Sequence, residues 1–223
     1  MGSFTGFTDA AFEFFMALAF DNTAQTMERL RPQFNEHVLA PLKALSSDCT
    51  QTLFVIDPEI DFRPVMGGTI SRIRRDTRYS RDKTPYRDYM WLDFRRKRES
   101  CHLGFHFSIS PRGASVSMGL HDATSDVRDA VRAYTVAHGA RYRALHELLA
   151  AQGYAFLGET YKRAMTKAQD PVVFAFGQKR WFTYRKPIPM EAVRHPELSE
   201  QLAREFTALA PLYQFIRTAT GGI

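Results

Sequence analysis

The residues best suited to chemistry lie in one short stretch, residues 72–86, which reads RIRRDTRYSRDKTPY. A guanidinium group stays charged at any working pH and matches carboxylate or phosphate oxygens with two parallel hydrogen bonds. Several arginines that converge on one pocket would therefore suit a doubly charged anion. A phosphate-bearing ligand, either a nucleotide or a nucleic acid, is the first expectation from this stretch.

The positive charge of the chain is concentrated around the same stretch. The sequence carries 30 Lys or Arg and 24 Asp or Glu residues, a formal net charge of +6. Residues 72–98 hold eleven of the basic residues and four Asp, which leaves 19 basic and 20 acidic residues elsewhere. Charge localised in this way attracts phosphates and other anions, and it says nothing about fold.

If residues 70–78 are extended, these side chains lie on two sides of the segment, because successive side chains of a strand point to opposite sides. One side would then hold Arg72, Arg74, Asp76 and Arg78, and the other Ile73, Arg75, Thr77 and Tyr79. Asp76 would lie among arginines that face the same way and could orient them. The candidate ligand-binding residues are Arg72, Arg75, Arg78, Tyr79, Asp82 and His106.

Two other interpretations of the stretch remain open. In an enzyme, Arg75 and Arg78 would clamp the substrate, Asp76 or Asp82 would act as general base, and Lys83 or Tyr86 would donate a proton. Lys83 could do so only if burial among arginines lowered its pKa. In a structural or partner-binding protein, the same arginines and aspartates would form an ionic lattice that holds a loop. The sequence contains no nucleophile elbow, Walker loop, H-E-x-x-H or dinucleotide fingerprint.

No metal site is predicted, and no cofactor is indicated. His102 and His106 share a strand face but would lie about 13 Å apart, too far to bind one ion. Asp57, Glu59 and Asp61 offer oxygen ligands, although a solvated acidic turn is the favoured interpretation.

Aromatic residues interleave with the basic ones, as in Tyr79, Tyr86, Tyr89 and Trp91. Rings between cations are typical of surfaces that hold single-stranded nucleic acids. The alternative is that Trp91 and Phe182 belong to the core and that the charges are solvated. Residues 95–98, Arg-Arg-Lys-Arg, are expected at the tip of a hairpin.

The periodicities predict one α+β domain over residues 1–223, in which an antiparallel sheet over about 53–120 is packed by N-terminal and C-terminal helices. Helices are expected over 8–20, over 24–48 with a kink at Pro41, over 125–151 with a bend at Gly139, and over 197–217 with a bend at Pro211. Extended segments are expected at Leu53–Ile56, Thr69–Ile73, Tyr89–Phe94, His102–Ser110, Ala114–Leu120, 154–161 and 180–186. Short strands and helices thus fill 124–218.

A cytoplasmic location is expected. The apolar run over residues 10–20 is too short to span a bilayer, so no membrane partner is expected. Cys49 and Cys101 have no paired spacing, which is typical of reduced thiols.

The stretch also resembles a known family. The pattern R-x-x-R-D-x-R-F-x-x-x-K-x-x-Y of the bacterial and fungal family called domain of unknown function 2461 is matched by Arg72, Arg75, Asp76, Arg78, Lys83 and Tyr86, with Tyr79 in place of Phe. Its opening F-x-G-F is similar to residues 4–7. The Trp expected after Asn22 is absent, and only Lys162 remains of a later K-x-x-P-x-G. The resemblance covers nearly the whole chain and implies no activity.

Overall fold

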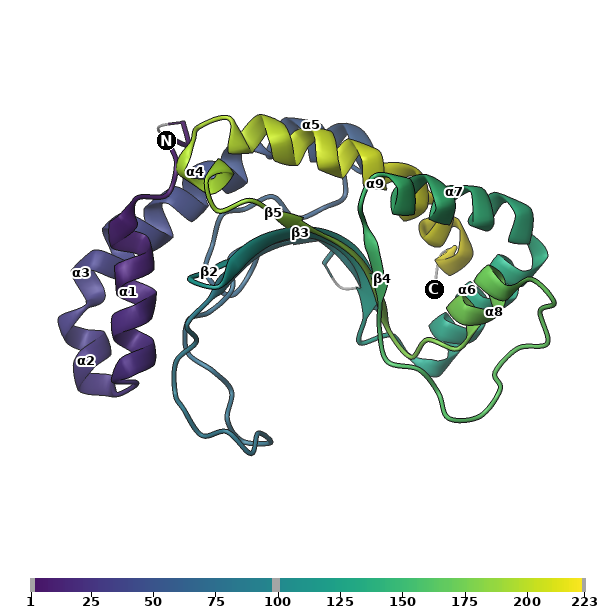
Figure 1. Ribbon diagram of the computed structural model, residues 1–223, viewed down its shortest axis with the longest axis horizontal. Coiled ribbons are helices and arrows are strands. Elements are labelled where there is room, and N and C mark those ends of the chain that lie inside the picture. Colours follow the sequence, from purple (N-terminus) through teal and green to yellow (C-terminus); the bar gives the residue numbers. More distant parts are fainter. Residues whose placement is uncertain (1–2, 98–100, 222–223) are drawn as a thin grey trace. The chain divides into compact units, whose positions relative to one another are not determined.

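The computed structural model describes residues 3–97 and 101–221 and has an α+β fold. A five-stranded antiparallel sheet has the order β1-β2-β3-β5-β4 (Figure 1). The strands are β1 Met90–Arg95, β2 His102–Ser110, β3 Gly113–His121, β4 Ala155–Leu157 and β5 Phe182–Ile188. The helices are α1 Asp9–Phe20, α2 Ala24–Arg29, α3 Arg31–Gln33, α4 Ala40–Asp48, α5 Thr50–Ile56, α6 Ser125–Ala137, α7 Gly139–Ala151, α8 Pro171–Gly177 and α9 Leu198–Thr220, with a π-helix η1 Phe34–Leu39 and a 3-10 helix η2 Ala192–Arg194.

The chain divides into two compact units. The first unit comprises Met1–Phe94, His106–Val116 and Pro187–Ala203, and the second comprises Arg95–Phe105, Ser117–Lys186 and Arg204–Ile223. Among the described residues, no helix is both long enough and apolar enough to cross a bilayer.

The core of the first unit is built on phenylalanine. Helix α1 buries Phe12, Phe14 and Phe15 on one side, and the Phe14 ring lies 5.4 Å from the Phe34 ring of η1. Phe7 stacks on Phe107 of β2 at 6.3 Å. Full burial of such a side chain stabilises a fold by about 1.5–3 kcal/mol, so these rings fix α1 and η1 in place.

The helical region over residues 24–56 is interrupted where Pro41 predicts a kink. Pro41 has no backbone N–H to donate, and its ring clashes with the carbonyl of the preceding turn. The turn before it is widened into the π-helix η1, in which the Ala40 N–H reaches back to the Asn35 carbonyl. The widened turn carries Phe34, which lines the cavity described below.

The expectation of extended structure at Leu53–Ile56 was wrong, because these residues form the end of α5. Leu53 N–H donates to Cys49 O at 3.2 Å and Asp57 N–H to Leu53 O at 2.8 Å, so the helical hydrogen bonding continues from α4. A four-residue apolar run has no periodicity that separates a strand from a buried helical turn. The sheet therefore starts later than residue 53.

The other predicted elements are largely confirmed. The expected strands over Tyr89–Phe94, His102–Ser110 and Ala114–Leu120 are β1, β2 and β3, and the bend expected at Gly139 separates α6 from α7. The extended segment expected over 154–161 contains β4, and the one expected over 180–186 overlaps β5, which continues to Ile188; β4 and β5 pair antiparallel. Of the basic run expected at a hairpin tip, Arg98 lies outside the described residues.

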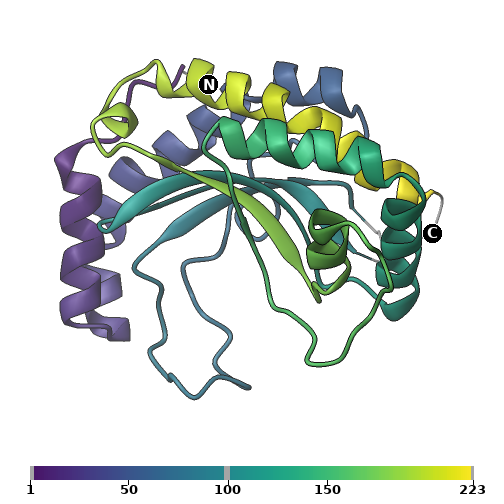
Figure 2. The ribbon, with the colours of Figure 1, turned by 45° about the vertical axis from the view of Figure 1, so that its right-hand side comes forward.

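Residues 69–93 of the first unit form a hairpin, which we call the basic hairpin. Its arms are residues 69–75 and 85–93, and its loop is residues 76–84. Four backbone hydrogen bonds join the arms: Asp93 N to Thr69 O, Ser71 N to Trp91 O, Arg87 N to Ile73 O and Arg75 N to Pro85 O, at 2.8–3.0 Å. The loop extends away from the neighbouring end of β2 (Figures 1 and 2).

The second unit contains a buried chain of polar groups among its packed rings. Tyr142 and Tyr184 hydroxyls lie 2.8 Å apart, and the Tyr184 hydroxyl lies 2.8 Å from Nδ1 of His146. With neutral His146, Nδ1 accepts from Tyr184 and Tyr184 accepts from Tyr142, so both hydroxyls donate a hydrogen bond. Burial lowers the pKa of His146, because a charged imidazole loses hydration there.

The stability of the protein should therefore fall in mild acid. The unfolded chain binds the proton of His146 near its ordinary pKa of about 6.5, whereas the folded chain binds it only at lower pH. The stabilisation is complete above about pH 6.5 and is lost as the pH falls through the lowered folded pKa. Urea midpoints between about pH 7 and pH 5 should decline more steeply for wild type than for His146→Gln. Equal declines would show that His146 is not the group responsible.

Candidate anion-binding site

Arg72 and Arg74 of the basic hairpin face outward because their neighbours in the sequence are buried. Ile73 is 6% exposed and Ser71 is likewise buried, while Arg72 and Arg74 are exposed. The guanidinium of Arg87 donates to the carbonyls of both Arg72 and Arg74 at 2.7 Å. This contact holds the arm extended, so that Arg72 and Arg74 project from the same side of it.

These two arginines border a cavity of about 260 Å³ in the first unit. It is lined by Met27, Arg31, Phe34, Met66, Arg72, Ile73, Arg74 and Tyr86. Buried apolar side chains (Met27, Phe34 and Ile73) thus meet three guanidinium groups and one phenol. An apolar floor with a few convergent polar groups is typical of small-molecule sites.

The polar groups that line the cavity differ in whether they have partners within the protein. Arg31 forms an exposed ion pair with Glu28 at 2.6 Å. Within residues 3–97 and 101–221, the guanidinium groups of Arg72 and Arg74 have no hydrogen-bond or ion-pair partner. The Tyr86 hydroxyl interacts electrostatically with Arg31 but has no hydrogen-bond partner among these residues. Two full cationic donors and one phenol therefore remain available to a ligand.

Close packing on Gly67 limits where Arg72 can lie. Gly67 has φ +82°, and a Cβ at this position would come within 2.6 Å of Arg72 Nε. A larger residue would be strained by its backbone and would push the guanidinium away. The turn before the hairpin thus helps to position one of the two available arginines.

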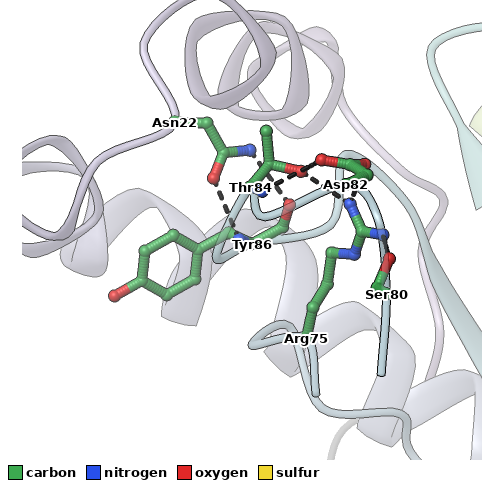
Figure 3. A network of polar contacts seen from close by, with 6 residues as sticks. All are labelled: Asn22, Arg75, Ser80, Asp82, Thr84 and Tyr86. Carbon is green, nitrogen blue, oxygen red and sulfur yellow. Dashed lines mark hydrogen bonds and ion pairs between the residues drawn. The ribbon is translucent and has the colours of Figure 1, made fainter. Parts of the chain in front are cut away.

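Tyr86 is held by Asn22, which lies between α1 and α2. The Asn22 side-chain amide donates to Tyr86 O and its Oδ1 accepts from Tyr86 N–H, both at 2.9 Å. These two bonds satisfy the backbone N–H and carbonyl of Tyr86 as a neighbouring strand would. They leave the Tyr86 ring pointing away from Arg75 and Asp82 (Figure 3), and the ring lines the cavity.

Arg75 has a different role from Arg72 and Arg74, because its guanidinium is used within the loop (Figure 3). It forms an ion pair with Asp82 and donates to Thr84 Oγ1 at 2.6 Å and to Ser80 Oγ at 3.4 Å. Asp82 in turn accepts from the Thr84 N–H and hydroxyl. Arg75 and then Thr84 hold the pKa of Asp82 well below its usual range.

Arg78 and Lys83 are also engaged inside the loop. Arg78 pairs with Asp76 at 2.7 Å, and hydrogen bonds from the Arg78 side chain and backbone lower the pKa of Asp76 to about 2. Lys83 Nζ donates to the Thr77 carbonyl at 2.8 Å. Asp76, Asp82, Arg75, Arg78 and Lys83 are absent from the cavity lining. Their assignment to ligand binding or catalysis stays a prediction.

His106 lies on the sheet rather than at the cavity. Its Nε2 is 3.0 Å from Asp93 Oδ1 of β1, and the neighbouring Ser108 and Ser115 hydroxyls bond across the β2–β3 hairpin at 2.9 Å. Trp91 is half-buried, whereas Phe182 belongs to the core of the second unit. No cluster of His, Cys, Asp or Glu within the described residues could hold a metal ion.

Among the arginines that line the cavity, Arg74 and Arg31 were not predicted as site residues from the sequence. Alternation already placed Arg74 beside Arg72, so period two alone could have added it. Arg31, Met27 and Phe34 precede the hairpin by about 40 residues, and nothing in their spacing links them to it. Only the packing of α2 and η1 near the first arm brings them together.

A sequence model of the family described as conserved hypothetical protein (DUF2461) matches residues 10–215. The chain belongs to this family. The DUF2461 match contains every residue that lines the cavity, and it confirms the resemblance inferred from residues 72–86. No curated protein and no solved structure matches the chain at a significant level. The family description names no activity, so the function has to be argued from the site.

Asn22→Asp should loosen Tyr86 and lower stability. The carboxylate keeps an acceptor for the Tyr86 N–H but cannot donate to the Tyr86 carbonyl, so one bond is lost at a cost of about 1–2 kcal/mol. The melting temperature should fall by several degrees. Gln25→Glu, which makes the same change at an exposed position of α2, should leave it nearly unchanged. Equal effects would mean that Asn22 acts through charge alone.

Arg75→Lys should release the loop, because a single ammonium cannot bond Asp82, Thr84 and Ser80 together. Amide hydrogen exchange of residues 76–84 should become several-fold faster, while exchange in α1 stays unchanged. Arg81→Lys is the matched control, since Arg81 is exposed and has no partner among the described residues. Identical exchange in both variants would contradict the structural role of Arg75.

Proposed function

We propose that this protein binds an anionic, phosphate-bearing ligand in the cavity lined by Arg31, Arg72, Arg74 and Tyr86. The observation that carries the proposal is the pair of guanidinium groups, Arg72 and Arg74, that have no partner among the described residues and lie on one side of a fixed extended arm. Because the arm is already ordered, little backbone freedom is left to lose when an anion binds. The Tyr86 hydroxyl supplies a further donor, and the apolar floor suits a base or another apolar group.

An enzyme that uses the same cavity has less support. A general base near neutral pH needs a carboxylate or imidazole with a suitable pKa close to the ligand. Asp76 and Asp82 are held as carboxylates by arginines in the loop, and neither lines the cavity. Of the candidate catalytic residues Asp76, Asp82, Lys83 and Tyr86, Tyr86 lines the cavity, and it would act as a hydrogen-bond donor to the bound anion.

We further propose a cytoplasmic location. Cys49 and Cys101 are both buried, and burial raises the pKa of the Cys49 thiol to about 12. Buried thiols of this kind are typical of reducing compartments, where phosphate-bearing metabolites and nucleic acids are abundant.

A thermal-shift experiment tests the binding proposal directly. Inorganic phosphate, nucleoside monophosphates and sugar phosphates are added to wild type and to an Arg72→Ala/Arg74→Ala double variant. A ligand at about 100 times its Kd adds about 2.7 kcal/mol, which should raise the melting temperature by roughly 5–10 °C in wild type. The double variant should fold normally, because both side chains are exposed and have no partner in the part of the chain that the structure describes, and it should show no shift.

Arg29→Ala is the matched control for charge. Arg29 is an exposed arginine of α2 that does not line the cavity. Its removal should leave most of the shift, since a single distant charge acts only through a screened field. A shift that survives in the double variant, or none with any phosphate compound in wild type, would reject the proposal.

A further inference from the structure

One aromatic side chain of the basic hairpin is almost completely in solvent. Tyr79 lies in the loop and is 95% exposed, with the guanidinium of Arg78 5.8 Å from the centre of its ring. Burial of an aromatic ring is normally favourable, so a ring presented in this way has a face available to a planar partner. Tyr79 does not line the cavity.

The charge around Tyr79 is positive after the internal ion pairs are considered. Residues 75–84 contain four basic and two acidic side chains. Both acids are paired, Asp76 with Arg78 and Asp82 with Arg75. The remaining charge is carried by Arg81, which has no partner among residues 3–97 and 101–221, and by Lys83. Such a surface favours a polyanion.

The loop is ordered before any ligand arrives. Arg75 ties Ser80, Asp82 and Thr84 together, and Lys83 closes the loop onto the Thr77 carbonyl. A ring on an ordered loop loses less conformational entropy on binding than one on a flexible loop.

A second aromatic surface lies on the arm over residues 85–93 of the same hairpin. Tyr89, 40% exposed, stacks on Trp91 with ring centres 5.7 Å apart, and the Arg87 guanidinium lies 5.1 Å from the Trp91 ring. The hairpin thus carries aromatic rings with cationic neighbours in its loop and on its arm, together with Arg72 and Arg74 at the cavity.

We infer that the ligand of the basic hairpin is a single-stranded nucleic acid, which places a phosphate at Arg72 and Arg74 and stacks a base on Tyr79. This inference rests on the proposed function, since it uses the same arginines. A ligand that reaches Tyr79 must extend beyond the cavity, and a chain of nucleotides does so, whereas a mononucleotide is accommodated within it. Unpaired bases expose the ring faces that an exposed tyrosine can stack on, while a duplex hides them.

Fluorescence anisotropy with a labelled oligothymidylate of about 12 nucleotides tests the inference on the whole protein. Loss of one base–aromatic stack weakens binding by about 5- to 150-fold, so Tyr79→Ala should raise the Kd by that factor. Tyr79→Phe keeps the ring and should bind within about twofold of wild type. Arg81→Ala should reduce the slope of log K against log salt by about 0.7, the value for one phosphate contact on a single strand.

The thermal shift with thymidine monophosphate separates this inference from the proposed function. That shift should be lost in Arg72→Ala/Arg74→Ala and retained in Tyr79→Ala, whereas both variants should bind oligothymidylate more weakly than wild type. If the monophosphate shift persists but the oligomer binds no more tightly, or if Tyr79→Ala binds it as well as wild type, the inference is overturned and the proposed function stands. If neither ligand binds, both fail. Equal binding of polyglutamate, with no dependence on Tyr79, would also overturn it.

Discussion

The candidate site depends on the extended arm over residues 69–75, whose alternation is enforced from both sides. Ser71 and Ile73 are buried on the opposite side of the arm, so Arg72 and Arg74 are turned to solvent. The Arg87 guanidinium binds the carbonyls of Arg72 and Arg74 and prevents the arm from twisting out of this register. The Arg87 guanidinium thus binds backbone carbonyls, while the guanidinium donors of Arg72 and Arg74 remain available to a ligand. Without that contact, the cavity would lose its fixed cationic border.

The arginines of the basic hairpin divide by the partners within their reach. Arg75 pairs with Asp82 and Arg78 pairs with Asp76, both carboxylates of the same loop, so these two arginines stabilise the loop. Arg72 and Arg74 meet none among the described residues. The ionic-lattice interpretation and the anion-binding interpretation therefore apply to different members of one motif. An ordered loop and an available pair of guanidinium groups complement each other, because preorganisation lowers the entropy lost on binding.

Much of the fold could be predicted where a segment carries its own period. The residue types of β2 and β3 alternate between apolar and small or polar over nine positions each. The break between α6 and α7 at Gly139 and the π-helix before Pro41 occur at single residues whose backbone limits are local. Leu53–Ile56 could not be assigned correctly, since an apolar run of four residues satisfies a strand or a helical turn equally. Its helical state is decided by the hydrogen bonds that continue from α4 through Cys49.

Three features follow from the residues alone: the α+β class, the concentration of positive charge around residues 72–98, and the shared side of Arg72 and Arg74. Charge and alternation are local properties of the chain, so they do not depend on contacts with distant residues. Which arginines remain available, and what surrounds them, depends instead on tertiary packing. Asn22 reaches Tyr86 across 64 residues, and Met27 and Phe34 supply the cavity floor from a separate helical region. Pairing and burial depend on groups that approach only when the chain folds, and no spacing along the chain encodes that approach.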